Sequence, residues 1–439
     1  MKSWHHLPDI YFLHIPKTAG TSVREVFEEL FPVGSVLPVS HLQELEKLPD
    51  EAIQNARFAS GHFGWRMVER AEALGKHLFV FTFLRDVVGL TISGMRYGAE
   101  APPEEAEALS GTIQENYERV IEGSKSGLME RIAGVEVDYS SGIPAMDPVT
   151  EEPFTHIMLR SLAGHGGEAE AVIPANEETL ALAKLRLNNL GAFGLVEDMQ
   201  ASIDLLCAAL GIPVFPPLPK RNVSTKTFAV SESFKLYTRH HNRFDVQLYE
   251  HAKTTLEDRK VELYATALNA SEDHLRNYRE IARQRFLQTM QSLPMIRSAK
   301  ISMADGLITE GFGHRFFYEP IQRWLRWAGK HAMIFLPLEP NVELNLKVEI
   351  ASSMTEAIRD GVSIWINGFE IPLKRNYEVW EDGGYYLVLS TTIPAGIIDP
   401  KAQYTAIEFR SPDDVLTTAP DRMGERASIA IAGIHVCIA

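Results

Sequence analysis

Cysteine is scarce in this chain, which has two, Cys207 and Cys437, among its 439 residues. Two cysteines so far apart cannot form a disulfide framework, and both fall in apolar patterns, so we expect two small core residues in a reducing compartment. The N-terminal residues Met1–Ile10 lack the apolar run of a secretory signal. No stretch of about 18 apolar residues occurs either. We therefore expect a cytoplasmic protein without a transmembrane segment.

The chain also lacks an excess of positive charge. Its net charge is −15, from 43 Lys and Arg against 58 Asp and Glu. Nucleic-acid binding requires clustered positive charge, so this composition argues against such a partner. The acidity is concentrated in residues 99–180, which hold 17 acidic and 4 basic residues. This stretch is either a solvated acidic insert or a substrate-facing surface that disfavours polyanions.

Hydrophobic patterning divides the chain into two kinds of structure. Three short apolar runs in the first half read as central strands of a parallel sheet, and helical patterns follow them: Ile10–Ile15, Leu78–Leu84 and Ala192–Val196. After about residue 297 the pattern alternates with a period of two, as in half-buried strands. The pair Asn367–Gly368 is a strong hairpin signal. We expect an α/β domain over 1–270, a helical linker over 271–297 and an all-β sandwich over 298–439.

The segment His14–Ser22 (HIPKTAGTS) lies between an expected strand and an expected helix. Such a loop directs backbone N–H groups and the positive end of the helix dipole at one point, which suits a phosphate. Gly20 allows close approach of the backbone, and Lys17 adds a positive charge. The order of Lys17 and Gly20 differs from that of a Walker A loop. From the residues alone, a phosphate loop and an ordinary helix start both remain open.

A second polar group follows the run FVFTFL at residues 79–84. Arg85 comes at the carboxyl end of this expected strand, where α/β folds bind ligands. Ser93 lies in the helical pattern that follows, and Arg85 and Ser93 could together bind a phosphate. Two other interpretations are open: a surface ion pair between Arg85 and Asp86, or a Walker-B-like role for Asp86.

Together these segments resemble the PAPS-dependent carbohydrate sulfotransferases, in the branch that contains the heparan-sulfate 2-O-sulfotransferases and their bacterial relatives. Further segments carry the resemblance over about residues 9–265: SGHF at 60–63, LRSLAG at 159–164, and PKRNVSTK at 219–226. His156 departs from it, since relatives often carry Asn upstream of the LRSLAG segment. The β-rich tail has no part in the resemblance. The implied fold is a P-loop-like three-layer α/β sandwich with a central parallel sheet.

The resemblance also implies an activity: transfer of a sulfonate from PAPS to a hydroxyl of a carbohydrate or glycoconjugate, leaving 3′,5′-ADP. In this role His62 is the general base, and Lys17 stabilises the leaving phosphate oxygen. Arg160 lies on the acceptor side, and no metal is required. The residues expected to bind the nucleotide are Lys17, Thr18, Ala19, Gly20, Thr21, Ser22, Arg85, Ser93, Arg221 and Asn222.

Two other functions stay open: a P-loop-type nucleotide kinase or NTPase, and a non-catalytic carbohydrate-binding protein. The displaced Lys17 argues against the first, and retention of Lys17, His62, Arg85 and Ser93 argues against the second. In the β-rich tail, Trp324, Trp327 and Trp365 could be core residues or a sugar platform. The acceptor's identity, the role of the tail and self-association into a homo-oligomer are not determined by the sequence.

Overall fold

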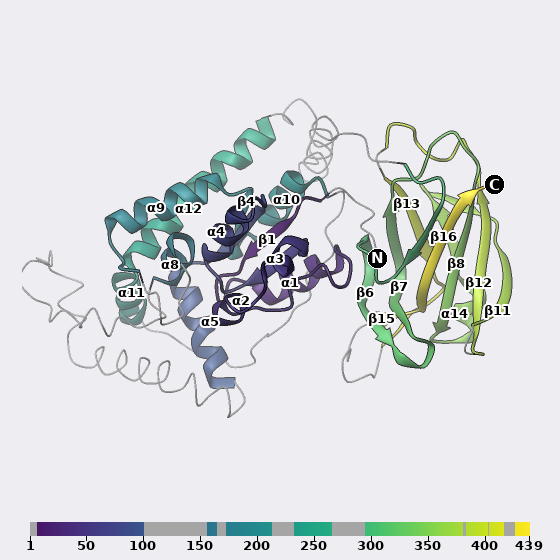
Figure 1. The fold of residues 1–439 in the computed structure, drawn as a ribbon, viewed down its shortest axis with the longest axis horizontal. Helices are drawn as coiled ribbons and strands as arrows, with labels where there is room; N and C mark the ends of the chain where they lie inside the picture. Colours follow the sequence, from purple (N-terminus) through teal and green to yellow (C-terminus); the bar gives the residue numbers. More distant parts are fainter. Residues whose placement is uncertain are drawn as a thin grey trace, which may run out of the picture.

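The structure is a computed structural model that describes residues 7–100, 156–164, 173–212, 232–265, 295–380, 383–402, 404–416 and 426–439. We call residues 7–265 the α/β region and residues 295–439 the β region (Figure 1). The predicted linker 271–297 lies outside the described residues except for 295–297, which are not helical. In the part of the chain that is described, no helix has both the length and the apolar character needed to cross a bilayer.

The α/β region contains four short strands and the helices around them. In chain order its elements are β1 (Ile10–Leu13), α1 (Gly20–Glu29), α2 (Leu42–Leu45), α3 (Asp50–Asn55), β2 (Phe58–Gly61), α4 (Arg66–Ala73), β3 (Phe79–Leu84), α5 (Val87–Glu100), α8 (Ile157–Ala163), α9 (Glu177–Asn189), β4 (Ala192–Leu195), the 3₁₀ turn η2 (Val196–Asp198), α10 (Met199–Leu210), α11 (Glu232–His241) and α12 (Arg243–Ala265). The three predicted strands are therefore present as β1, β3 and β4.

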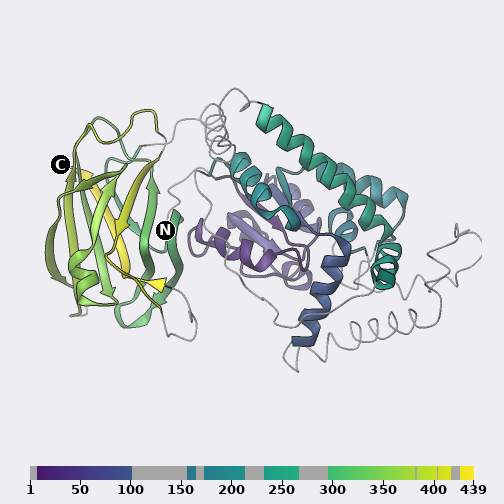
Figure 2. The same ribbon diagram turned by 180° about the vertical axis from the view of Figure 1, so that it is seen from behind.

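The four strands form one parallel sheet in the order β2-β1-β3-β4. Side chains alternate between its faces, so Tyr11 and Leu13 enter one apolar cluster while Ile10 and Phe12 enter another. The first cluster includes residues of α3, α4, α8, α9 and α12, and the second includes residues of α1 and α10. Helices thus cover both faces of the sheet, and Figure 2 shows the long α12 from behind.

The β region follows with antiparallel strands of 2 to 14 residues. Its elements are β5 (Ala299–Ser302), β6 (Ile308–Tyr318), the turn η3 (Glu319–Ile321), β7 (Arg323–Leu336), β8 (Leu344–Ser353), α14 (Glu356–Gly361), β9 (Ser363–Ile366), β10 (Phe369–Ile371), β11 (Lys374–Val379), β12 (Tyr385–Ile393), β13 (Thr405–Arg410), β14 (Val415–Leu416), β15 (Arg426–Ala427) and β16 (Ile429–Ile438). Ten of these strands join one curled sheet, which has one large apolar cluster and a smaller one around Trp380 and Tyr386.

The predicted hairpin at Asn367–Gly368 is confirmed, since both residues have positive φ and join the antiparallel strands β9 and β10. The prediction that both cysteines are buried is half right. Cys207 is buried on α10, but Cys437 is exposed. The period of two explains this result: the buried Val436 precedes Cys437 on β16, so the thiol lies on the outer face of the sheet.

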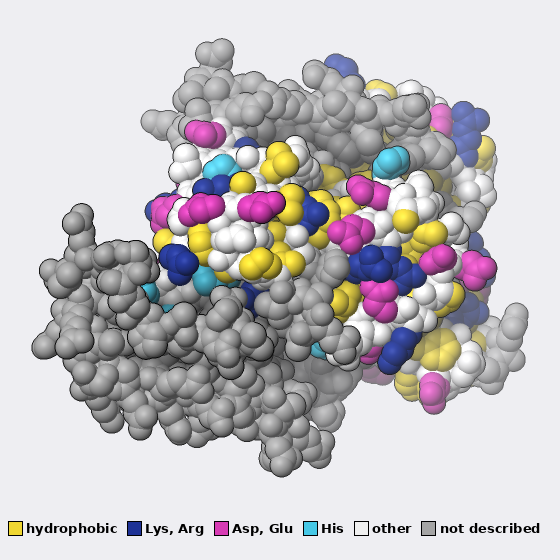
Figure 3. All heavy atoms as spheres, turned by 60° about the vertical axis from the view of Figure 1, so that its left-hand side comes forward, with side chains coloured by type: hydrophobic (Ala, Val, Ile, Leu, Met, Phe, Trp, Pro, Cys, Tyr) yellow, Lys and Arg dark blue, Asp and Glu magenta, His cyan; other side chains and the backbone are white. Residues whose placement is uncertain are grey.

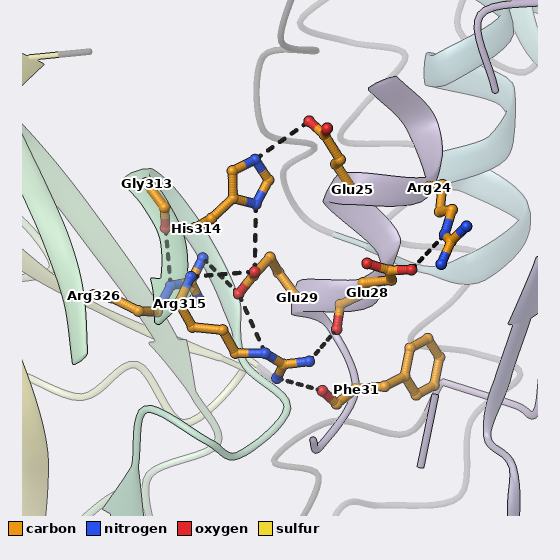
Figure 4. Close-up of polar contacts among 9 residues, drawn as sticks. All are labelled: Arg24, Glu25, Glu28, Glu29, Phe31, Gly313, His314, Arg315 and Arg326. Carbon is orange, nitrogen blue, oxygen red and sulfur yellow. Dashed lines mark hydrogen bonds and ion pairs between the residues drawn. The ribbon is translucent and has the colours of Figure 1, made fainter. Parts of the chain in front are cut away.

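The two regions are joined at the C-terminal end of α1 (Figure 4). The guanidinium of Arg315, on β6, donates to the carbonyl oxygens of Glu28 and Phe31, both at 2.6 Å. Glu28 lies in the last turn of α1 and Phe31 lies just after it, so both bonds add donors at the end of a helix, where backbone carbonyls are short of partners. Gly306 permits the approach, because a Cβ at that position would lie 2.4 Å from the Leu30 carbonyl oxygen. The β region therefore caps a helix of the α/β region.

A buried carboxylate lies at the centre of this contact. Glu29, on α1, accepts from the backbone N–H of Arg315 and lies 3.6 Å from Nη2 of Arg326 and 3.4 Å from Nδ1 of His314. Burial alone would raise the pKa of Glu29, but Arg326, His314 and Arg315 together hold it below its usual value. Ile308 of β6 adds apolar packing, since it joins the cluster around α1 and α10. The contact is thus both charged and apolar.

We predict that Arg315→Ala lowers the free energy of unfolding by about 3 kcal/mol, because it removes a partner of a buried carboxylate and two helix-capping hydrogen bonds. Urea unfolding of the full chain measures this change. The control is Arg297→Ala, since Arg297 is 61% exposed where it pairs with Glu339. Equal unfolding midpoints for the two variants would contradict the interpretation.

Candidate functional site

The carboxyl ends of all four parallel strands meet at one edge of the α/β sheet. The loop 14–19 follows β1, His62 follows β2, Arg85 follows β3, and Glu197 follows β4. The sheet order places β1 next to β3, although β2 intervenes in the sequence. This is the topological switch point, where open α/β sheets bind their ligands. The loop 14–19, His62 and Arg85 therefore gather where the fold favours a site.

The loop after β1 has an unusual backbone. Lys17 and Ala19 have φ values of 66° and 63°, in the left-handed region that non-glycine residues rarely adopt. Thr18, between them, is fully buried and donates its hydroxyl to the carbonyl of Ile15 at 2.8 Å. Ala19 is the N-cap of α1 and has no side chain that could cap it. The N-cap side chain therefore makes no capping hydrogen bond to the first-turn amides of α1.

Arg85 holds this loop from the neighbouring strand. Its Nη1 donates to the carbonyl oxygen of Lys17 at 3.0 Å, across 68 positions of sequence. This bond links the ends of β1 and β3 at the switch point. It also explains how the left-handed conformation of Lys17 is maintained, because a strained backbone persists only where its surroundings fix it.

Asp86 has a local structural role. Its Oδ2 accepts from the amides of Val88 and Gly89 and so caps the start of α5. The amide of Asp86 in turn donates to Glu197, which also accepts from the hydroxyl of Tyr249 at 2.9 Å. Burial, followed by the contact with Glu197, raises the pKa of Tyr249. Asp86 therefore works as a helix cap joined to β4 and α12.

His62 lies beside the loop and is oriented by it. Its Nδ1 is 2.9 Å from the carbonyl oxygen of His14. A carbonyl only accepts, so Nδ1 must carry a proton, and in the neutral ring the basic lone pair is on Nε2. The rings of His14 and His62 are 4.5 Å apart between centroids. Burial, followed by the charges of His62, Arg24 and Lys17, lowers the pKa of His14 well below its usual value.

Gly20 is required by the packing of His14. A Cβ at Gly20 would lie 1.7 Å from Nε2 of His14, which is far inside van der Waals contact. The imidazole of His14 therefore occupies the space where a larger residue would place its side chain. This contact fixes the position of His14, whose backbone carbonyl orients His62.

Arg160 lies in the predicted LRSLAG segment on α8 and is fully buried. Asp245 of α12 accepts from the amides of Met158 and Leu159, which anchors the start of α8 to α12. His156, the N-cap of α8, has a φ of 54°, and burial followed by the charge of Arg160 lowers its pKa to about 3. The described contacts of this segment are thus structural, and acceptor binding by Arg160 stays a prediction.

The remaining predicted residues differ in what the structure describes. Thr21 and Ser22 lie in the first turn of α1, and Ser93 lies on α5, part-buried, in the helix that begins beside Arg85. Arg221 and Asn222 fall outside the described residues, as does most of the acidic stretch 99–180. Over the face in Figure 3, acidic and basic side chains of the described residues are interspersed with hydrophobic ones.

Two residues of the site were missed by the sequence reasoning. His14 received no role, although it is the first residue after β1, and Glu197 received none, although it is the second residue after β4. The available signal was the same one that identified Arg85: a polar residue just after a buried strand.

Comparisons with known proteins leave the family open. No family model matches the chain, and no curated protein matches it. Among solved structures, a family 35 carbohydrate-binding module from Clostridium thermocellum is 9% identical, and the alignment covers 33% of this chain and 100% of the module with a TM-score of 0.22. At that score the likeness carries no argument about this chain.

We predict that Gly20→Ala destabilises the protein by about 1–3 kcal/mol, because the added methyl overlaps the imidazole of His14. Thermal and urea unfolding measure the loss. The matched control is Gly94→Ala on α5, where a Cβ meets nothing within 4 Å. Alanine favours a helix over glycine, so this control should be neutral or slightly stabilising. Equal effects at the two positions would refute the packing argument.

Proposed function

We propose that this protein is a sulfotransferase that moves a sulfonate from PAPS to a hydroxyl of a carbohydrate or glycoconjugate. The observation that carries the proposal is the hydrogen bond from Arg85 to the carbonyl of Lys17. It brings the two predicted phosphate-binding segments together at the switch point, with His62 adjacent. In the proposal, the α/β region is a P-loop-like three-layer sandwich whose domain extends over residues 1–270.

The loop 14–19 after β1 suits the 5′-phosphate of the sulfonate donor, PAPS. The first-turn amides of α1 and the positive end of its dipole provide donors for phosphate oxygens, and the turns at Lys17 and Ala19 shape the backbone around them. Arg85 carries a planar guanidinium that can bind a second phosphate, which is the 3′-phosphate in this proposal. Ser93, Arg221 and Asn222 complete the expected nucleotide contacts. The donor supplies an activated sulfonate whose leaving group is the 5′-phosphate.

The chemistry assigns one proton transfer to His62. Since Nδ1 donates to the His14 carbonyl, Nε2 is the atom that takes the proton of the acceptor hydroxyl. The acceptor oxygen forms the new O–S bond as the bond from sulfur to the leaving phosphate oxygen breaks. Lys17 stabilises the charge that develops on that phosphate oxygen. The remaining catalysis comes from positioning, as in phosphoryl transfer.

Nucleotide binding gives the first test. We predict that the protein binds 3′,5′-ADP in preference to 5′-AMP, and that Arg85→Ala weakens 3′,5′-ADP about 10- to 100-fold by removing charge-assisted hydrogen bonds. Arg85→Lys keeps the charge and should recover part of the affinity. Isothermal titration calorimetry without magnesium measures each constant. Tighter binding of magnesium-ATP would instead support a kinase or NTPase.

The base gives the second test. We predict that His62→Ala lowers the rate of sulfonate transfer by about 10²–10⁴-fold while 3′,5′-ADP still binds. An acceptor screen with labelled PAPS and mass detection of products measures the rate. The control is His77→Ala, an exposed residue before β3 at the opposite edge of the sheet. Transfer at full rate by His62→Ala would remove His62 from the mechanism. Carbohydrate binding with no nucleotide binding would favour the non-catalytic alternative.

A further inference from the structure

The β region contains a cavity where strand β16 changes partner. Residues Ile429–Ile431 of β16 pair with β7, whereas Gly433–Val436 pair with β5. The pairing of β16 with β8 has register irregularities between Ala430 and Ile431 and between Ile431 and Gly433. Such bulges are common next to binding sites because they redirect strands. Here a cavity of about 120 Å³ opens at the change of partner.

The cavity is lined by polar and aromatic side chains from four strands: Lys300 and Ser302 on β5, Arg323 and Trp324 at the start of β7, Glu349 on β8 and His435 on β16. Its size admits several water molecules or one edge of a sugar ring. It is far smaller than the 300–1,000 Å³ typical of drug-sized ligands. The site is therefore matched to a small polar group and not to a nucleotide.

Its floor is a carboxylate over a glycine. Gly433 pairs with Glu349 across β16 and β8, and a Cβ at Gly433 would lie 2.9 Å from Oε2 of Glu349. Nε2 of His435 lies 2.9 Å from Oε1 of Glu349, so His435 pairs with that oxygen, whereas Oε2 lies over Gly433. Glu349 is 9% exposed. Its carboxylate is thus a largely buried acceptor that Gly433 leaves accessible from the cavity.

The rim is positively charged. One row of directly paired positions crosses β5, β16 and β8 and consists of Lys300, His435 and Lys347. The side chain of Lys300 is exposed. Arg323 lies over the ring of Trp380 at 4.4 Å, which positions its guanidinium beside the cavity. Lys347 pairs with Glu378 at 3.1 Å. Lys300 and Arg323 therefore give the cavity an excess of positive charge over the single Glu349.

We propose that this cavity binds a sugar bearing one anionic group, with Glu349 and Ser302 contacting hydroxyls and Lys300 and Arg323 contacting the anion. A carboxylate acceptor beside a hydroxyl suits a polyhydroxylated ring, since each sugar hydroxyl both donates and accepts. The oxygen of Ser302 already accepts from the amide of Ala304, so its O–H remains able to donate. The two cations select an acidic group, which is a carboxylate or a sulfate.

The experiment uses the full chain and four probes: D-glucose, D-glucuronate, D-glucose 6-sulfate and inorganic sulfate. Ligand-observed NMR with titration measures each dissociation constant. We expect both anionic sugars to bind about tenfold or more tightly than glucose and inorganic sulfate, because only they engage both sets of groups. The two anionic probes show whether a carboxylate or a sulfate is preferred. Equal binding of glucose, or binding of inorganic sulfate alone, overturns the proposal.

Variants locate the binding. Lys300→Ala should weaken the anionic sugars about tenfold and leave glucose unchanged, and Gly433→Ala should weaken all three sugars by filling the floor. The matched control is Lys374→Ala, at an exposed position of the same row on the far strand β11. Arg85→Ala, in the α/β region, should have no effect, which separates this cavity from the proposed nucleotide site. Equal losses for Lys300→Ala and Lys374→Ala would overturn the assignment. Thermal unfolding confirms that each variant is folded.

Discussion

Helix α1 is the element on which both halves of the molecule depend. Its N-terminus follows the strained loop that contains Lys17 and Ala19, and its last carbonyls accept hydrogen bonds from Arg315 of the β region. A helix has a positive N-terminus and a negative C-terminus, so each end has a complementary environment. The guanidinium of Arg315 satisfies the negative end, and the positive end points to the edge of the sheet where the candidate site lies. The packing of one helix therefore links the site with the interface.

Much of the α/β site follows from local sequence. Strands β1 and β3 are short apolar runs, and a polar residue just after such a run lies at the carboxyl edge of the sheet, which made Lys17 and Arg85 predictable as neighbours. Strand β2 was not predicted, and His62 was singled out only through the family resemblance. The details are not local. The bond from Arg85 to Lys17 joins residues 68 positions apart, and the contact of His14 with Gly20 depends on how the loop folds back. No periodicity encodes either contact.

In the β region, too, the sequence pattern predicts local structure but not the contacts between distant strands. Alternation correctly predicted the strands and the hairpin at Asn367–Gly368, because it records which face of a strand is buried. It does not record which strands pair. The change of partner along β16, which opens the cavity above Gly433, depends on β7 and β5, which lie about 100 and about 130 residues earlier in the chain. Cys437 was misassigned for a related reason, since an apolar residue near the end of a strand can lie on either face.

The contact between Glu29, Arg315 and Arg326 also limits how far the two regions can be treated as separate modules. Glu29 is contributed by α1, and both guanidinium groups by the β region, where their side chains are 8% and 3% exposed. Grafting the β region onto another protein would leave two nearly buried cations without their carboxylate, at a cost of several kcal/mol. Any evolutionary transfer of the β region to a different protein would require an acidic residue at the C-terminal end of the helix that it contacts there. The joining of the α/β region and the β region is thus constrained by charge as well as by shape.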